Sequence, residues 1–183
     1  RWIDPASPYH KTYTISGIAP TDPRWWDDRA AYLAGGGVVC YEQDWLSEIY
    51  PHSPEMARSL APGALFADNM ARATHQHGQT MQYCMATPRF FLQGAKYGSL
   101  TTIRTSGDRF DRGKWNDFIY TSQLAHALGL WPWADVFMSD ETDNMLLATL
   151  SAGPVGTGDG LGRESRPNIL LAVRGDGVIV KPD

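Results

Sequence analysis

The alternation of strand-like and helix-like segments constrains the fold most strongly. The strand-like segments are rich in β-branched and aromatic residues, and they cover residues 36–45, 80–86, 100–108, 130–139 and 154–159. They are apolar along their length and do not alternate between apolar and polar residues. Such strands are typical of a parallel sheet covered by helices. The sequence therefore predicts an α/β fold, either a doubly wound sheet or part of a β/α barrel.

Helix boundary signals separate these strands. Residues 22–37 begin with Asp22 and Pro23 and end in a glycine run, as a capped helix does. Pro54 and Pro62 can each begin a helical piece, and Gly78 ends the second. Further helices are expected within residues 112–129, 140–153 and 166–177, with a loop or short helix at 88–99.

Global composition limits the class of protein. The chain has 183 residues, 43% of them hydrophobic and 20% charged, which predicts a globular fold. No linker or repeat divides it, so we expect one domain over residues 1–183. No G-x-G-x-x-G motif follows a strand, and the dinucleotide-binding fold has no support.

Charge and hydropathy indicate which partners to expect. A formal net charge of -4 argues against non-specific binding to nucleic acid, which needs basic surface. No apolar run approaches the roughly 20 residues of a membrane span, and no signal-peptide pattern opens the chain. We therefore expect neither a nucleic-acid nor a membrane partner.

The two cysteines do not form a disulfide framework. Cys40 and Cys84 lie in apolar, strand-like runs, so we expect both to be buried thiols. No cysteine or histidine cluster has zinc spacing, and the sequence predicts no metal site.

Aspartates follow four of the five expected strands: Asp44, Asp108, Asp135 and Asp159. Aspartate is a poor strand former and a good helix cap, so capping can explain any single one. In a β/α barrel, however, catalytic groups lie at the carboxyl ends of the strands. Four aspartates at such positions favour a carboxylate-rich barrel mouth.

An ordered set of segments resembles one enzyme group. The segments VVCYEQDW, MQYCMA, IRTSGDRF, LWPWADVFMS, LSAGPVGTGD and DGVIVKPD occur in this order within residues 30–183. In this the chain resembles the α-galactosidase and raffinose synthase group of glycoside hydrolases (families 36 and 27 and their relatives). The resemblance implies a (β/α)8 TIM barrel, which needs about 250 residues. We therefore expect a fragment covering about strands 4 to 8.

The resemblance also implies catalytic roles. It places the nucleophile on Asp44 and the general acid/base on Asp108. Retaining glycosidases need two such carboxyl groups about 5–5.5 Å apart, one ionised and one carrying a proton. No metal or cofactor is required.

Alternation along a strand places Arg104, Ser106 and Asp108 on one face. Arg104 is expected to bind a sugar hydroxyl and to stabilise the anionic form of Asp44. The alternative is an ordinary buried ion pair.

Four more residues are expected to bind substrate. Asp135 matches an aspartate of the raffinose synthase motif, Trp133 offers either a sugar platform or core packing, and Asp159 follows the last expected strand. Glu42 stands where galactose-specific relatives have a lysine, on the same face as Asp44. This replacement leaves three interpretations: a differently arranged sugar, another nucleophile, or lost activity.

We expect a retaining α-glycosidase that acts on an α-linked oligosaccharide or glycoside. The nearest alternative is a raffinose synthase-like transglycosylase, which uses a sugar acceptor in place of water. The second class is a non-catalytic, carbohydrate-binding degenerate barrel. An unrelated β/α enzyme is the third.

Overall fold

The computed structural model describes residues 3–182 and contains two compact units, Arg1–Thr101 and Thr102–Asp183. The border between them falls within strand β5 (Leu100–Arg104). Four strands form a parallel sheet in the order β3-β4-β5-β6, with helices between successive strands. The predicted α/β class is therefore confirmed. The single domain expected over residues 1–183 stays a prediction.

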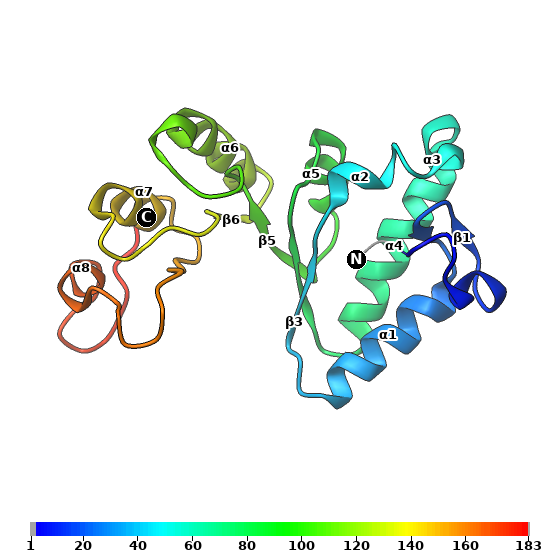
Figure 1. Ribbon diagram of the computed structural model, residues 1–183, viewed down its shortest axis with the longest axis horizontal. Coiled ribbons are helices and arrows are strands. Elements are labelled where there is room, and N and C mark those ends of the chain that lie inside the picture. The colour runs from blue at the N-terminus through cyan, green and yellow to red at the C-terminus, as the bar shows by residue number, and fades with distance from the viewer. Residues whose placement is uncertain (1–2, 183) are drawn as a thin grey trace. The chain divides into compact units, whose positions relative to one another are not determined.

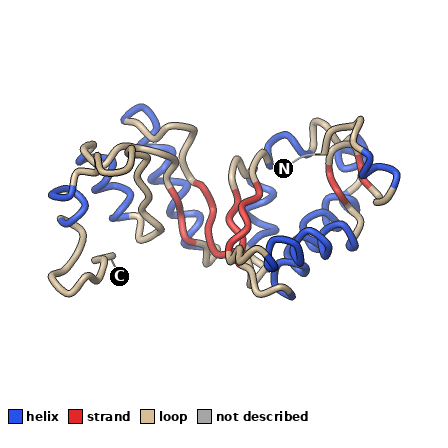
Figure 2. The backbone as a smooth tube through the Cα atoms, turned by 60° about the horizontal axis from the view of Figure 1, so that its bottom comes forward, coloured by secondary structure: helices blue, strands red, loops and turns tan. Residues whose placement is uncertain are grey.

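Unit 1 contains two kinds of strand pair. The antiparallel pair β1 (Ile15–Ser16) and β2 (Ala19–Pro20) follows the short 3-10 helix η1 (Pro8–Lys11), and Figure 2 shows it apart from the parallel strands. The parallel pair is β3 (Cys40–Gln43) and β4 (Thr80–Tyr83). The helices of this unit are α1 (Pro23–Gly35), α2 (Leu46–Ile49), α3 (Pro54–Arg58), α4 (Leu60–Gln76) and α5 (Pro88–Gly94).

The core of unit 1 lies between α1, α4 and one face of the β3–β4 pair (Figure 1). Trp26 of α1 packs edge-on against Tyr41 of β3 and Phe66 of α4, at ring-centroid distances of 6.2 and 5.5 Å. Burial of such large rings contributes much of the free energy of folding.

The other face of β3 is not covered, which corrects one prediction. Cys40 and Glu42 are exposed whereas Gln43 is buried, so β3 alternates and is not apolar throughout. The expected burial of Cys40 is therefore wrong, because within unit 1 the described helices do not cover this face. The expected burial of Cys84 is confirmed.

The boundaries of α1 follow the predicted signals closely, whereas the helix expected within residues 166–177 ends already at Leu170. The Asp22 carboxylate caps α1 by accepting the Arg24 N–H at 2.9 Å, and α1 ends at the glycine run. Helix α4 begins at Leu60, capped by Ser59, so it starts two residues before the expected Pro62. Proline is tolerated there because backbone N–H groups in the first turn have no partner within the helix.

Unit 2 begins with the last three residues of β5, which pair in parallel with β6 (Trp131–Trp133). Arg104 is opposite Trp133 in this register. The remaining elements are η2 (Arg112–Lys114), α6 (Trp115–Ala127), α7 (Thr142–Leu150) and α8 (Arg166–Leu170). Its core is a cluster around Phe110, Phe118 and Phe137.

The strand expected over residues 154–159 is wrong, because the structure assigns these residues to no strand. Gly156 and Gly158 favour irregular backbone, and Gly158 donates its N–H to Phe137 O at 2.9 Å. The segment therefore lies against the chain that follows β6 without forming a strand ladder. Among residues 3–182, no helix combines the length and apolar character needed to cross a bilayer.

Candidate functional site

Two carboxylates meet one guanidinium in unit 2. Arg104 Nη1 donates to Asp108 Oδ1 at 2.7 Å and also to Asp135 Oδ2. The side chains of Arg104 and Asp135 are 8% and 19% exposed, whereas that of Asp108 is 79% exposed. Arg104 and Asp135 thus form a largely buried ion pair. Asp108, which binds the same guanidinium, faces solvent.

The backbone after β5 explains this arrangement. Thr105 N–H still bonds to Trp133 O at 2.9 Å, which keeps the two chains paired beyond the strand. Ser106 Oγ then accepts the Asp135 N–H at 2.8 Å. The chain turns after this point and returns Asp108 to Arg104. The expected grouping of Arg104 with Asp108 is therefore present, through a turn and not through continued strand alternation.

Lys114 is a site residue that the sequence did not reveal. Its ammonium group donates to the backbone carbonyls of Asp108 and Arg109, the latter at 2.8 Å. Arg109 has a φ of 51°, a conformation that non-glycine residues seldom adopt and that often marks functional loops. Lys114 holds this turn in place, and with it the backbone of Asp108.

Unit 1 places Asp44 directly after β3. Its Oδ1 accepts the N–H of Trp45 at 2.7 Å, and Trp45 has a left-handed φ of 62°. Met85, two residues after β4, also has a positive φ, of 52°. Two adjacent parallel strands therefore end in unusual backbone at the same edge. The strain supports a functional interpretation of this edge.

Glu42 lies on the uncovered face of β3, opposite Gln82 in the register with β4. Alternation continued one residue beyond the end of β3 would place Asp44 on the same face. The expected carboxylate and guanidinium groups are thus divided between the two units. Unit 1 contains Glu42 and Asp44, and unit 2 contains Arg104, Asp108 and Asp135.

Trp133 and Asp159 take different places in unit 2. Trp133 is half-buried in β6, in register with Arg104, and its carbonyl accepts the Thr105 N–H. Asp159 accepts the Ser139 N–H, with a shorter distance of 3.0 Å to Oδ2. Burial would raise the pKa of Asp159, but this bond and the hydroxyls of Thr157 and Ser139 outweigh it and lower the pKa. Asp159 therefore anchors the loop before α7.

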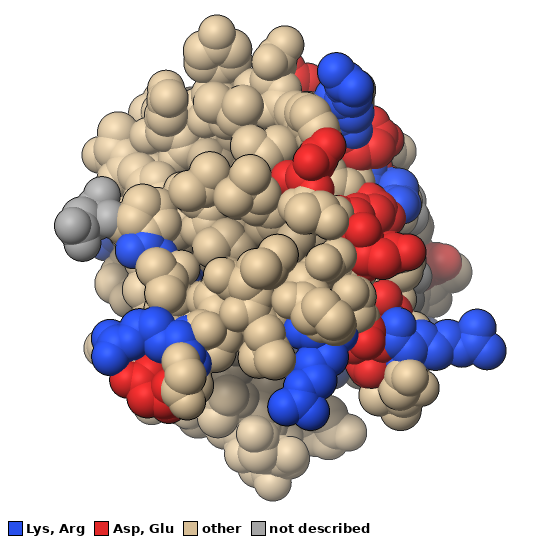
Figure 3. Space-filling view, turned by 90° about the vertical axis from the view of Figure 1, so that its left-hand side faces the viewer, with Lys and Arg blue, Asp and Glu red and all other residues tan. Residues whose placement is uncertain are grey.

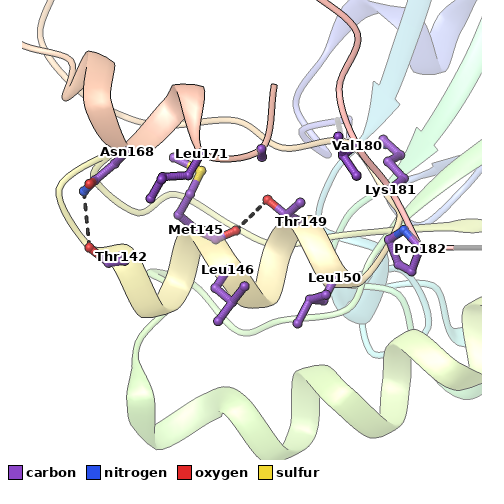
Figure 4. Close-up of a pocket in the computed structure, with 11 residues that line it drawn as sticks. Thr142, Met145, Leu146, Thr149, Leu150, Asn168, Leu171, Val180, Lys181 and Pro182 are labelled. Atoms are coloured by element: carbon purple, nitrogen blue, oxygen red, sulfur yellow. Dashed lines mark hydrogen bonds between the residues drawn. The ribbon is translucent and has the colours of Figure 1, made fainter. Parts of the chain in front are cut away.

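Unit 2 also contains an apolar cavity of about 490 Å³ between α7, α8 and residues 171–182 (Figure 4). Its polar side chains are already bonded: Asn168 Nδ2 donates to Thr142 Oγ1 at 3.3 Å, and Thr149 Oγ1 to Met145 O at 2.8 Å. None of the carboxylates described above lines it. Figure 3 looks onto unit 2 and shows a broad uncharged surface with acidic side chains gathered along one side. Among the described residues, the cavity itself is lined by no carboxyl or imidazole group, and the ammonium group of Lys181 in its wall donates to the carbonyls of Ala152 and Gly153.

In unit 2, the Arg104 guanidinium and the carboxylates of Asp108 and Asp135 form one hydrogen-bonding cluster, and the exposed Asp108 is open to solvent. Guanidinium and carboxylate groups form strong hydrogen bonds with hydroxyls. Within residues 3–182, no three His, Cys, Asp or Glu side chains are placed to hold a metal ion.

No protein-family model matches the sequence, and no curated protein matches it.

Proposed function

We propose that the chain is the strand 4 to 8 portion of an α-galactosidase-like (β/α)8 barrel, acting as a retaining α-glycosidase on α-linked glycosides. One observation carries the proposal: solvent-facing Asp108 is attached to an Arg104–Asp135 pair that is largely buried. The sequence resemblance assigns the acid/base role to the same aspartate.

The difference in exposure between Asp108 and Asp135 suits two separate roles, proton transfer for Asp108 and neutralisation of Arg104 for Asp135. An acid/base group must reach the glycosidic oxygen, and Asp108 can leave Arg104 at small cost because exposed ion pairs contribute only about 0–1 kcal/mol. Asp135 continues to neutralise Arg104 when Asp108 moves. Arg104 is then able to bind a sugar hydroxyl, as expected from the sequence. Trp133, in register with it, is proposed to pack against the sugar, and Asp159 to position the neighbouring loop.

The proposed reaction has two steps. Asp44 attacks the anomeric carbon, the bond from that carbon to the leaving oxygen breaks, and Asp108 gives this oxygen its proton. Asp108 then takes a proton from water, whose oxygen attacks the anomeric carbon and releases Asp44. Both groups end in their starting states, and the anomeric configuration is retained. A sugar hydroxyl in place of water would give transglycosylation.

Glu42 is proposed to determine the sugar configuration. Its carboxylate accepts hydrogen bonds, whereas the lysine of galactose-specific relatives donates them. A Glu42→Lys variant should therefore shift the preference between galacto- and gluco-configured aryl α-glycosides. An unchanged ratio of kcat/KM values for the two would remove Glu42 from the binding site.

Covalent trapping tests the proposal directly. The protein is incubated with fluorinated glycosyl fluorides of galacto and gluco configuration, which stall the glycosyl-enzyme, and the labelled peptide is mapped by mass spectrometry. We expect a sugar adduct on Asp44. An adduct on Glu42 would reassign the nucleophile. Saturable sugar binding with neither adduct nor hydrolysis would replace the proposal by a carbohydrate-binding barrel.

Azide rescue separates the two roles. With an activated aryl α-glycoside, Asp44→Gly plus azide should give the β-glycosyl azide, because azide enters from the vacated face. Asp108→Ala plus azide should give the α-glycosyl azide, because the covalent intermediate still forms. Asp117→Ala is the matched control, as Asp117 is an exposed aspartate of α6. The same azide anomer from both variants would contradict the assignment.

A further inference from the structure

A second pocket lies in unit 1, between η1 and α1. Its cavity of about 340 Å³ is lined by the aromatic residues Tyr9, Tyr13, Trp25 and Tyr32, together with Asp28 and Arg29. This volume falls in the range of small-molecule sites, about 300–1,000 Å³. None of the residues Glu42, Asp44, Arg104, Asp108 and Asp135, together called the carboxylate site, belongs to it.

The pocket is built by regular structure on one side. Trp25, Asp28, Arg29 and Tyr32 have the i, i+3, i+4, i+7 spacing of one helix face. Trp25 rests edge-on against buried Trp26, with ring centroids 4.7 Å apart. The helix therefore holds these side chains along the face that borders the cavity.

A hydrogen bond and a ring contact fix the other side. Tyr13 Oη donates to Asp28 Oδ2 at 2.7 Å, which ties the segment after η1 to α1. The Tyr9 and Tyr13 rings lie 6.1 Å apart and tilted by 56°. Tyr9 and Tyr32 are nevertheless 51% and 74% exposed. Exposed aromatic rings around a hollow are typical of binding surfaces.

We propose that this aromatic pocket binds a neutral saccharide, outside the carboxylate site. A pyranose presents apolar C–H faces that stack on aromatic rings and hydroxyls that bond to groups such as Asp28 and Arg29. The tyrosine hydroxyls provide further donors and acceptors at the rim. The pocket combines both kinds of surface within one cavity.

The charges around the rings disfavour a cationic ligand. Arg24 lies over Tyr13 with its Cζ 6.0 Å from the ring centroid, and Arg29 lies over Tyr32 at 5.9 Å. Two ring faces are thus occupied by guanidinium groups, which repel another cation. A neutral ligand avoids this repulsion and can still stack on the remaining ring surface.

The test is a titration with melibiose, maltose and cellobiose, in which saturation-transfer difference NMR measures binding. It uses the protein, the exposed-ring variants Tyr32→Ala and Tyr9→Ala, and the control Tyr120→Ala, which removes a 71% exposed tyrosine from α6. We expect saturable binding of at least one disaccharide. The dissociation constant should rise about tenfold in Tyr32→Ala, from the loss of one stacked ring, and stay unchanged in Tyr120→Ala.

Three results would overturn the proposal. The first is no saturable binding of any disaccharide, and the second is equal binding by the protein and both ring variants. The third is Tyr32-dependent binding of tetramethylammonium without saccharide binding, which would show a cation site. Saccharide binding that persists in Asp44→Asn supports the proposal, because it shows that binding in this pocket does not depend on the proposed nucleophile. Loss of glycosidase activity therefore leaves this inference standing.

Discussion

Arg104 and Asp108 form an ion pair whose two side chains differ sharply in exposure, 8% for the guanidinium and 79% for the carboxylate. The same Arg104 nitrogen also binds Asp135, which is 19% exposed. The guanidinium is therefore fixed by one carboxylate and shared with another that solvent and ligands can reach.

This asymmetry predicts unequal effects on stability. Asp108→Asn should change the free energy of unfolding by less than about 1 kcal/mol, as for exposed ion pairs. Asp135→Asn should cost about 1–3 kcal/mol, because a largely buried guanidinium loses its buried counter-charge. Urea denaturation of the two variants measures both values. Equal losses would show that Asp135 does not anchor Arg104.

Asp22 predicts a pH-dependent contribution to stability. The hydrogen bonds from the Arg24 side chain, together with those from the backbone N–H groups of Thr14 and Arg24, lower the pKa of Asp22 to about 2 despite its burial. Because the pKa is lower in the folded state than its unfolded value of about 3.9, the stabilisation is complete above that value. It is lost as the pH falls from about 4 to 2.

The matched variant for this prediction is Asp22→Asn, which keeps a capping side chain without the charge. At pH 7, the free energy of unfolding of the unsubstituted protein should be about 1 kcal/mol higher than that of Asp22→Asn. The gap should close between about pH 4 and pH 2. Denaturation curves at a series of pH values measure this difference, in which titrations common to both proteins cancel. A gap independent of pH would contradict the role given to the ion pair.

Gly153 predicts a strict size limit beside β6. A Cβ at this position would lie 1.6 Å from the carbonyl oxygen of Pro132, so Gly153→Ala forces the backbone to move. We expect a loss of about 1–3 kcal/mol or more in the free energy of unfolding. Gly156→Ala is the control, because its Cβ would meet no atom within 4 Å. Similar stability of the two variants would contradict this packing.

The sequence predicted the elements that carry both an apolar pattern and end signals. Helix α1 has Asp22 and Pro23 at its start and glycines at its end, and the structure agrees closely. The segment at 154–159 has the apolar start but no long run of β-branched residues, and its glycines leave it without a ladder. Burial of Cys40 was mispredicted because an apolar run does not show which face of a strand is covered.

The site was predictable only as far as strand geometry reaches. Alternation predicted that Arg104 and Asp108 lie together, and they do, but through a turn after β5. Asp135, the aspartate that follows β6, was also recognised as a candidate and binds the same guanidinium. The contact of Lys114 with the Asp108 carbonyl depends on the turn at Arg109, whose positive φ is usual for glycine and unusual for arginine. No residue pattern in the sequence marks such a turn.

Thiol chemistry tests the uncovered face of β3. Cys40 is exposed and Cys84 is buried, so a thiol reagent should modify Cys40 rapidly and Cys84 only after unfolding. Absorbance of the released thiolate from a disulfide reagent follows both phases. Cys40→Ser should remove the fast phase alone. Slow modification of Cys40 in the folded protein, at a rate like that of Cys84, would show that this face is covered in solution.

The proposed role of Asp108 predicts a dependence on the leaving group. A sugar or alkyl alcohol needs a proton to depart, whereas a dinitrophenolate does not. Asp108→Ala should therefore lower kcat/KM for the alkyl α-glycoside by about 10²–10⁴-fold and for the dinitrophenyl α-glycoside far less. Asp44→Ala should impair both substrates, because each needs the nucleophile, and Asp117→Ala should impair neither. If Asp108→Ala lowers kcat/KM equally for the two leaving groups, Asp108 is not the proton donor, and its bond to Arg104 has a positioning role.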